Sequence, residues 1–342
     1  MLNQKPLFNP SGDREIEKRR IIKGNPTNLF ELNNVKYQWA YDFYKIMAFD
    51  NYWIPQEIPM NNDRKQYEEL SKEERDAYDK VLSFLVFLDS LQTNNLPNFA
   101  DYITAPEVVM ALTAQDFQEA LHSFSYAYII DSVIDPLERD RIYNLWRDDE
   151  VLFERNKVIA NEYQRFLDEP NEENFIRALF ANYILEAIYF YAGFAFFYCL
   201  GRQGKMLGTV QEIRYINRDE LTHVQLFQHI ISTVKKENPE LFNEEVYELA
   251  YKLFEKAVKQ EIKWGQYITK NKIIGLNNDI IDQYIKYLGN LRLKQIGLNP
   301  LWPEIKKHPM QWIEEFRKIN TTKTDFFQAR PATYTKPSNL KW

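Results

Sequence analysis

Residues 183–200 read YILEAIYFYAGFAFFYCL, an apolar run that contains one acidic side chain, Glu186. Its uninterrupted part, residues 187–200, is 14 residues long, whereas a helix needs about 20 apolar residues to span a bilayer. A carboxylate inside a membrane span would also be costly. We therefore expect a helix buried in the middle of a large helical bundle, with no membrane partner and with Glu186 inside the core.

The composition of the 342-residue chain favours long helices with few connections. It has only 10 glycines, while 23 Phe, 22 Tyr and 7 Trp supply a large core. We find no internal repeat and no strand-like alternation. The formal charge of −6 gives no sign of nucleic-acid binding, and the single Cys199 favours a reducing compartment. The expectation is an all-α cytoplasmic protein without a secretory signal.

Local signals divide the chain into three parts and place the helices. Ser71 and Glu74 have the spacing of a capping box and begin a helix that continues to about Leu91. We expect an irregular N-terminal arm over 1–30, a single helical domain over 31–320 and a flexible tail over 321–342. Further helices are predicted near 106–134, within 137–168, and near 171–201, 210–236, 243–270 and 277–297.

Two of the four histidines follow a glutamate by three positions, in Glu119 with His122 and Glu220 with His223. Residues at i and i+3 lie on one face of a helix, where they can bind neighbouring metal ions. Tyr126 continues the first of these faces one turn further. For each pair alone, a hydrogen bond on the helix surface is an equally good interpretation.

Two more carboxylates fall within apolar helical patterns. Glu186 has aromatic residues on its own side of the helix, and a lone buried carboxylate is costly unless it is paired or bound to a metal. The nearest arginines in the sequence, Arg177 and Arg202, are two turns or more away, which favours a functional role. Asp89 lies on an apolar seam too, although a cap or surface group near a helix end would also explain it.

Together these residues match the pattern of a di-metal carboxylate bundle: two helices each supply one carboxylate and two others each supply Glu-x-x-His. Four carboxylates balance two divalent cations, and oxygen and imidazole ligands suit Fe(II) or Mn(II). We predict a ferritin-like helical bundle holding two metal ions per chain. Iron is the first expectation, with Mn/Mn or Mn/Fe as alternatives. The expected ligands are Asp89, Glu119, His122, Glu186, Glu220 and His223.

The chain also resembles the small, radical-generating subunit of class I ribonucleotide reductase over roughly residues 53–298. The resemblance lies in five motifs that occur in the family's order and spacing. They are FLDSLQ around Asp89, EALHSFSYAYII from Glu119, LEAIYFYAGF around Glu186, INRDELTH ending at His223, and IGLNNDIIDQYIKY from Ile274.

The resemblance implies a role for each group near the metals. The six residues above would be the metal ligands, O₂ would be activated there, and Tyr126 would store a tyrosyl radical. Phe190, Phe194 and Ile216 would shield that radical, although ordinary core packing is the commoner role for each residue taken singly. Trp53 and Asp219 would form a hydrogen-bonded relay from His122 towards the surface, with aromatic packing as the alternative for Trp53.

The resemblance further implies that the protein works with a partner. Tyr334 would pass the oxidising equivalent on, and the final SNLKW would dock on the large catalytic subunit, which reduces ribonucleotides to deoxyribonucleotides. Only eight residues follow Tyr334, fewer than in some members of the family. A homodimer is expected from the family as well.

Three other functions fit parts of the pattern. A di-metal oxidase or hydroxylase with its own small substrate needs the same bundle but has no use for Tyr334 or a docking tail. A metal-storage shell needs no tyrosine beside the metals. A purely structural bundle gives no reason to bury four acids.

Overall fold

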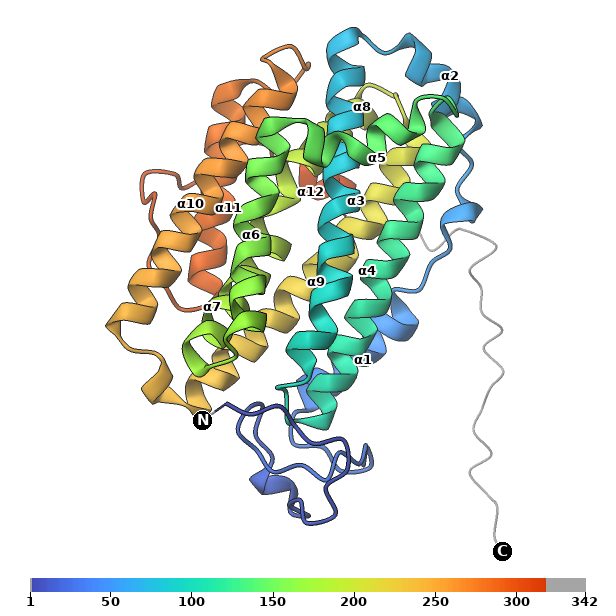
Figure 1. Ribbon diagram of the computed structural model, residues 1–342. Coiled ribbons are helices and arrows are strands. Elements are labelled where there is room, and N and C mark those ends of the chain that lie inside the picture. Colours follow the sequence, from blue (N-terminus) through green and yellow to red (C-terminus); the bar gives the residue numbers. More distant parts are fainter. Residues whose placement is uncertain (1, 318–342) are drawn as a thin grey trace, which may run out of the picture.

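The computed structural model describes residues 2–317, and its helices run mostly side by side along one direction (Figure 1). Between residues 2 and 317 the only β pairing consists of two isolated bridges. The prediction of an all-α, ferritin-like bundle is therefore confirmed. The α-helices are α1 (Gln38–Lys45), α2 (Asn61–Glu69), α3 (Lys72–Ala100), α4 (Pro106–Val133), α5 (Arg139–Asp148), α6 (Glu150–Asp168), α7 (Glu172–Ile184), α8 (Tyr191–Arg202), α9 (Leu207–Glu237), α10 (Glu244–Thr269), α11 (Asn278–Gln295) and α12 (Ile313–Arg317).

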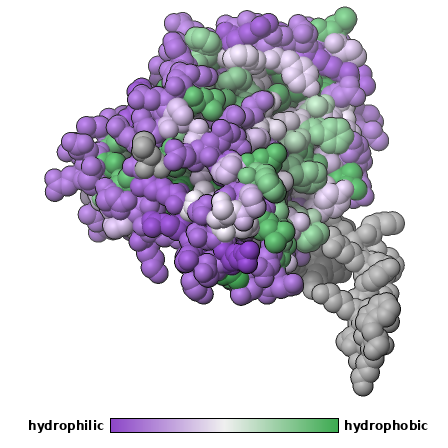
Figure 2. Space-filling view, turned by 60° about the horizontal axis from the view of Figure 1, so that its bottom comes forward, coloured by the Kyte–Doolittle hydropathy of each residue, from purple (hydrophilic) through white to green (hydrophobic). Residues whose placement is uncertain are grey.

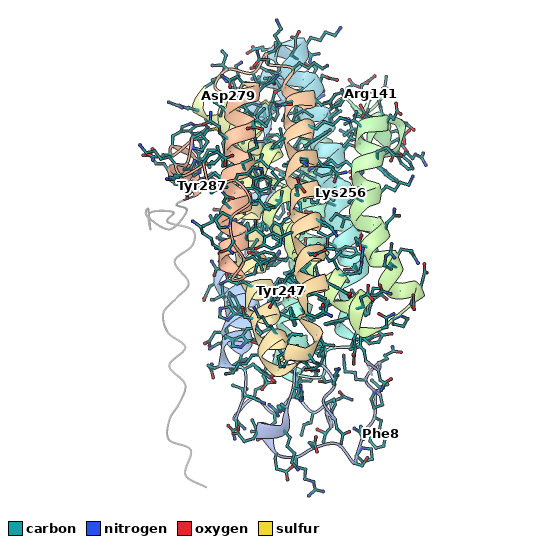
Figure 3. All side chains as sticks on the ribbon, turned by 90° about the vertical axis from the view of Figure 1, so that its left-hand side faces the viewer. Phe8, Arg141, Tyr247, Lys256, Asp279 and Tyr287 are labelled. Atoms are coloured by element: carbon teal, nitrogen blue, oxygen red, sulfur yellow. The ribbon has the colours of Figure 1, made fainter. Side chains whose placement is uncertain are left out.

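The long helices pack around one core. Helix α3 lies along α4, and α9 contacts α4, α7 and α8. On the side turned to the viewer in Figure 3, α10 stands between α11, labelled at Asp279 and Tyr287, and the helices that follow Arg141. Helix α10 also contacts α3, α7 and α8, so it closes this side of the core.

Helix α3 begins as the sequence predicts but ends later. The Ser71 hydroxyl accepts a hydrogen bond from the Glu74 amide at 3.2 Å, and the Glu74 carboxylate accepts one from the Ser71 amide at 2.9 Å. The helix then continues past the expected end at Leu91 to Ala100. Asp89 is therefore in the middle of a helix and fully buried, which removes the interpretation as a cap or surface group.

The predicted helix over 171–201 contains an irregularity that periodicity does not reveal. Between α7 and α8 the backbone forms a π-helical turn, η4 (Leu185–Tyr189), which includes Glu186. A π turn holds one more residue than an α turn, and such turns often occur at functional sites. The whole stretch Glu172–Arg202 is long and apolar enough to cross a membrane, but 94% of its most apolar window is buried inside the protein. It is the core helix that the sequence predicts.

The described chain before α1 is irregular except for one 3₁₀ turn, η1 (Ile16–Lys18), and an isolated bridge between Asp13 and Pro26. Ile21 anchors this segment, since it is fully buried and its carbonyl accepts from the Thr104 amide at 2.7 Å. A π turn, η2 (Ile46–Asp50), directly follows α1. Two short 3₁₀ turns complete the secondary structure, η3 (Pro55–Glu57) and η5 (Pro239–Leu241). The predicted tail over 321–342, with Tyr334, lies outside the described residues.

Candidate metal centre

Four helical segments bring the six predicted ligands into one place in the core. All six are fully buried, with none of their surface exposed. They lie on α3 (Asp89), α4 (Glu119 and His122), η4 (Glu186) and α9 (Glu220 and His223).

Within this cluster the ligand atoms form two overlapping groups of four. In each group the nitrogen and oxygen atoms all lie within 4.8 Å of one another. One group is Asp89, Glu119, His122 and Glu220, and the other is Glu119, Glu186, Glu220 and His223. Glu119 and Glu220 belong to both groups.

Both histidines turn the same ring nitrogen towards the cluster. Nδ1 of His122 lies 3.1 Å from Glu220 Oε1, and Nδ1 of His223 lies 3.1 Å from Glu119 Oε1. The other nitrogen, Nε2, contacts a group outside the cluster: Asp219 at 3.4 Å for His122, and the Gln118 oxygen at 2.8 Å for His223. An outer partner of this kind holds a ligand histidine in one orientation and tautomer.

The inner atoms of the cluster lack hydrogen-bond partners. Both oxygens of Asp89 are buried without one, as are His122 Nδ1, Glu119 Oε2, Glu186 Oε2 and Glu220 Oε1. Buried polar atoms in native proteins are nearly always satisfied, so this many unpaired atoms facing one another fit a site for a bound group. Four carboxylates and two imidazoles fit two hard or borderline divalent cations.

The electrostatics of the cluster support the same interpretation. Burial raises the pKa of Asp89 and of Glu186 well above the usual range, and the charge of Glu119 raises both further. Burial alone would lower the pKa of His122, but its hydrogen bond to Asp219 and the nearby carboxylates raise it well above normal. Divalent cations would relieve the repulsion between these carboxylates on binding.

Side-chain amides surround Glu186, and sequence analysis did not single them out. Gln92 on α3 and Gln115 on α4 both donate to Glu186 Oε1, the latter at 2.8 Å. Tyr163 on α6 donates to Gln92 and Asn182 at 3.1 Å each. The available signal was spacing, because Gln92 follows Asp89 by three residues and Gln115 precedes Glu119 by four.

Tyr126 lies beside the first group of ligands in a dry environment. The residue is fully buried, and burial together with the charge of Asp89 raises the pKa of its phenol well above the usual value. Phe190, Phe194 and Ile216 are also fully or almost fully buried, and the rings of Phe190 and Phe194 stack with centroids 5.7 Å apart.

Trp53 and Asp219 are joined in the way that a relay requires. The indole Nε1 of Trp53 donates to Asp219 Oδ2 at 2.9 Å, and the same oxygen faces His122 Nε2. Arg218 donates to the other oxygen, Oδ1, at 3.0 and 3.1 Å. The Trp53 ring stacks on Tyr215, with centroids 5.2 Å apart. Trp53 is thus connected through one carboxylate to a histidine of the cluster.

Comparison with known proteins identifies the family. Residues 29–309 match the family model described as ribonucleotide reductase, small chain. The chain belongs to this family. The beta subunit of ribonucleoside-diphosphate reductase from Treponema pallidum is 48% identical over 342 residues, covering 99% of this chain and 97% of that protein.

Solved structures agree with this assignment. The ribonucleotide reductase R2 subunit from Clostridium botulinum superposes with a TM-score of 0.90 at 54% identity, covering 93% of this chain and 99% of that one. The dimanganese(II) NrdF of Streptococcus sanguinis, at 22% identity and a TM-score of 0.68, covers 80% of this chain and 94% of that one and shares the fold. The protein is a class I ribonucleotide reductase small subunit with a buried di-metal carboxylate site, and it works with the alpha subunit of ribonucleoside-diphosphate reductase.

Proposed function

We propose that the six clustered residues hold two metal ions and that Tyr126 stores the radical of this small subunit. The observation that carries the proposal is the pair of four-residue groups that share Glu119 and Glu220, with Tyr126 buried beside one of them. When bound, the metal pair would supply the chemistry that oxidises Tyr126, with O₂ as the oxidant. The chain itself positions the ions, holds the phenol next to them and excludes water.

The surroundings of Tyr126 determine how it reacts. Because its pKa is raised, the phenol is protonated before oxidation and must lose a proton together with an electron. Asp89 is the carboxylate that interacts with this phenol, and we propose that the proton leaves the phenol on the Asp89 side. Phe190, Phe194 and Ile216 support the proposed shielding through their burial, because an apolar wall keeps water and reductants away from the phenoxyl oxygen.

We further propose that the oxidising equivalent leaves by way of Trp53. The hydrogen bonds from Trp53 to Asp219 and the contact of Asp219 with His122 give a continuous polar path out of the cluster. Arg218 holds Asp219 in place by donating hydrogen bonds to its second oxygen. Tyr334 is the proposed next residue in radical transfer towards the large subunit.

Iron is the proposed resident metal. The six ligands accept Fe(II) and Mn(II), but Fe(II) in histidine and carboxylate sites is the ion that reacts directly with O₂. The Streptococcus sanguinis relative holds two manganese ions, so a manganese pair is the alternative. A tyrosyl signal after adding Fe(II) and O₂, and none after adding Mn(II) and O₂, would support iron. The reverse result would favour manganese.

The C-terminal residues are proposed to dock on the large subunit. Deleting residues 333–342 should leave metal binding and radical formation unchanged, because the cluster is built only from α3, α4, η4 and α9. Turnover with the large subunit should fall to background, since both Tyr334 and the apolar end SNLKW are removed. Assays of metal content, EPR signal and nucleotide reduction on the same preparation check this. Retained turnover would refute the role of the tail.

We propose that the protein is a homodimer that pairs through α4. Phe117 and Phe124 are 50% and 47% exposed, and with Leu121 and Tyr128 between and beyond them they follow one face of the helix. In Figure 2 hydrophobic residues gather on the right-hand side, where Figure 1 places α4. An apolar stripe of this kind marks an interaction surface, and a two-fold pair would cover it on both copies.

Charges on this stripe should separate the two copies. In the double variant Phe117→Asp and Phe124→Asp, light scattering should give half the wild-type mass, because each charge would be buried without a partner. Phe153→Asp is the matched control, since Phe153 is an aromatic residue on α6 that is 41% exposed. A dimeric mass in the double variant would exclude α4 as the interface.

We also propose a cytoplasmic location. The single cysteine, Cys199, is buried in the core helix, where it has no partner for a disulfide. A protein that needs no disulfide fits a reducing compartment.

A further inference from the structure

The end of the π turn η4 is bonded by side chains from two other helices. Arg155 on α6 donates from Nη2 to the carbonyl oxygen of Tyr189, the last residue of η4, at 2.7 Å. Glu261 on α10 accepts at Oε1 from the amide of Ala192 at 2.7 Å. Arg155 and Glu261 also bind each other directly. One ion pair therefore holds a carbonyl and an amide that lie just beyond Glu186.

These bonds replace part of the regular helix pattern. In an α-helix the amide of Ala192 would donate to the carbonyl four residues earlier, and in a π turn the partner lies five residues earlier. Where the chain changes from one pattern to the other, backbone groups need partners from elsewhere, because a buried backbone group without a partner is costly. Glu261 and Arg155 supply such partners.

The Arg155–Glu261 ion pair is buried in the core, where charged side chains are costly. Glu261 is fully buried and Arg155 is 4% exposed. The guanidinium lies 4.1 Å from the ring centroid of Phe84, 4.8 Å from that of Tyr189 and 5.3 Å from that of Trp264. A desolvated ion pair contributes little net stability compared with apolar residues of the same size. Its hydrogen bonds to the Tyr189 carbonyl and the Ala192 amide instead favour one backbone conformation of this segment.

A second arginine reaches the same turn from the other side of α10. Arg292 on α11 donates from Nε to the carbonyl of Ala187 at 3.4 Å and from Nη2 to the Tyr191 hydroxyl at 2.7 Å. In Figure 3 α10 lies between α11 and the helices that follow Arg141, so the helices that carry the two arginines, α6 and α11, flank α10 on opposite sides.

We propose that the Arg155–Glu261 pair is a positioning element that fixes the π geometry of η4 and thereby aims Glu186 at the metal cluster. Each residue turns a helix by about 100°. Without the extra residue held in η4, the segment before it would rotate by about that angle relative to α8. Glu186 could then not face the cluster while α8 keeps its present packing. The inference rests on the proposed role of Glu186 as a metal ligand.

The test uses Mn(II) as the probe, because free Mn(II) is counted directly by EPR. Wild-type protein is expected to bind two ions per chain. In the charge-balanced double variant Arg155→Met and Glu261→Leu, the ion held by the group that contains Glu186 should bind about 10- to 100-fold more weakly, the usual effect of losing an outer partner. The ion in the group with Asp89 should remain, and the EPR signal of a coupled pair should give way to that of a single ion.

Three further proteins make the result decisive. The variant Arg141→Gln with Asp79→Asn removes an ion pair of 2.6 Å between α5 and α3 that does not touch η4, and it should bind both ions normally. Glu261→Gln keeps the volume and an oxygen for the Ala192 amide but loses the charge that holds Arg155. If the double variant fails to fold, the same selective loss in Glu261→Gln supports the proposal. Glu186→Ala tests the ligand role itself.

The binding results distinguish the positioning role of Arg155 and Glu261 from the ligand role of Glu186. Wild-type affinity for both ions in a folded double variant, or in Glu261→Gln, overturns the positioning role. Equal weakening of both ions overturns it as well, because that is the result of a general loss of stability. If Glu186→Ala binds two ions like the wild type, the proposed ligand role of Glu186 fails instead.

Discussion

Replacing Tyr126 with phenylalanine is expected to abolish the tyrosyl EPR signal that forms when the apoprotein is given Fe(II) and O₂, and to remove turnover with the large subunit. Phenylalanine has no hydroxyl proton to lose and is far harder to oxidise. The ring stays in place, and the change deletes one buried oxygen, so the cost in folding stability should be at most about 1 kcal/mol. Metal content should remain at two ions per chain.

Tyr163→Phe is the matched control for this experiment. Tyr163 is also a buried tyrosine whose pKa is raised by burial and by Glu186, but its hydroxyl donates to the amides of Gln92 and Asn182. Those groups do not accept a proton readily, so the EPR signal should survive in this variant. A signal that persists in Tyr126→Phe and disappears in Tyr163→Phe would move the radical to α6 and contradict the assignment.

Replacing Glu119 with alanine should remove both metal ions, whereas Asp89→Ala should weaken only one. Glu119 belongs to both groups of four, and Asp89 belongs to one. Loss of metal binding should also remove the stabilisation that the metal provides. A ligand at 100 times its dissociation constant stabilises a folded protein by about 2.7 kcal/mol. The wild-type melting temperature should therefore rise on adding metal, and that of Glu119→Ala should not. Elemental analysis and thermal unfolding with and without metal measure the two effects.

Glu107→Ala separates metal binding from ordinary burial. Glu107 is a fully buried carboxylate on the same helix, but it accepts from Arg19 at 2.7 Å and from the Lys36 amide at 2.8 Å, away from the cluster. Its removal should lower the melting temperature of the apoprotein and leave the increase caused by metal unchanged. Two ions bound to Glu119→Ala would show that this residue does not bridge the ions.

Much of the metal centre could be predicted from local sequence because its signals act over one or two helical turns. Glu119 and His122 share a helix face through their spacing alone, and the capping box at Ser71 sets the start of α3 within a few residues. The burial of Glu186 follows from the apolar residues around it in the sequence. These features depend on periodicity and side-chain type, which a single segment carries in full.

Only the packed structure decides which groups meet. The sharing of Glu119 and Glu220 between the two halves of the site depends on how α4 and α9 face each other, and no spacing along one helix encodes that relation. The π turn at Glu186 depends in the same way on Arg155 and Glu261, which reach η4 from α6 and α10. Buried backbone and carboxylate groups take the nearest available partner in space. The sequence therefore determines the helices and the residues they bury, while tertiary contacts determine the register of η4 and the way the six side chains divide into two groups.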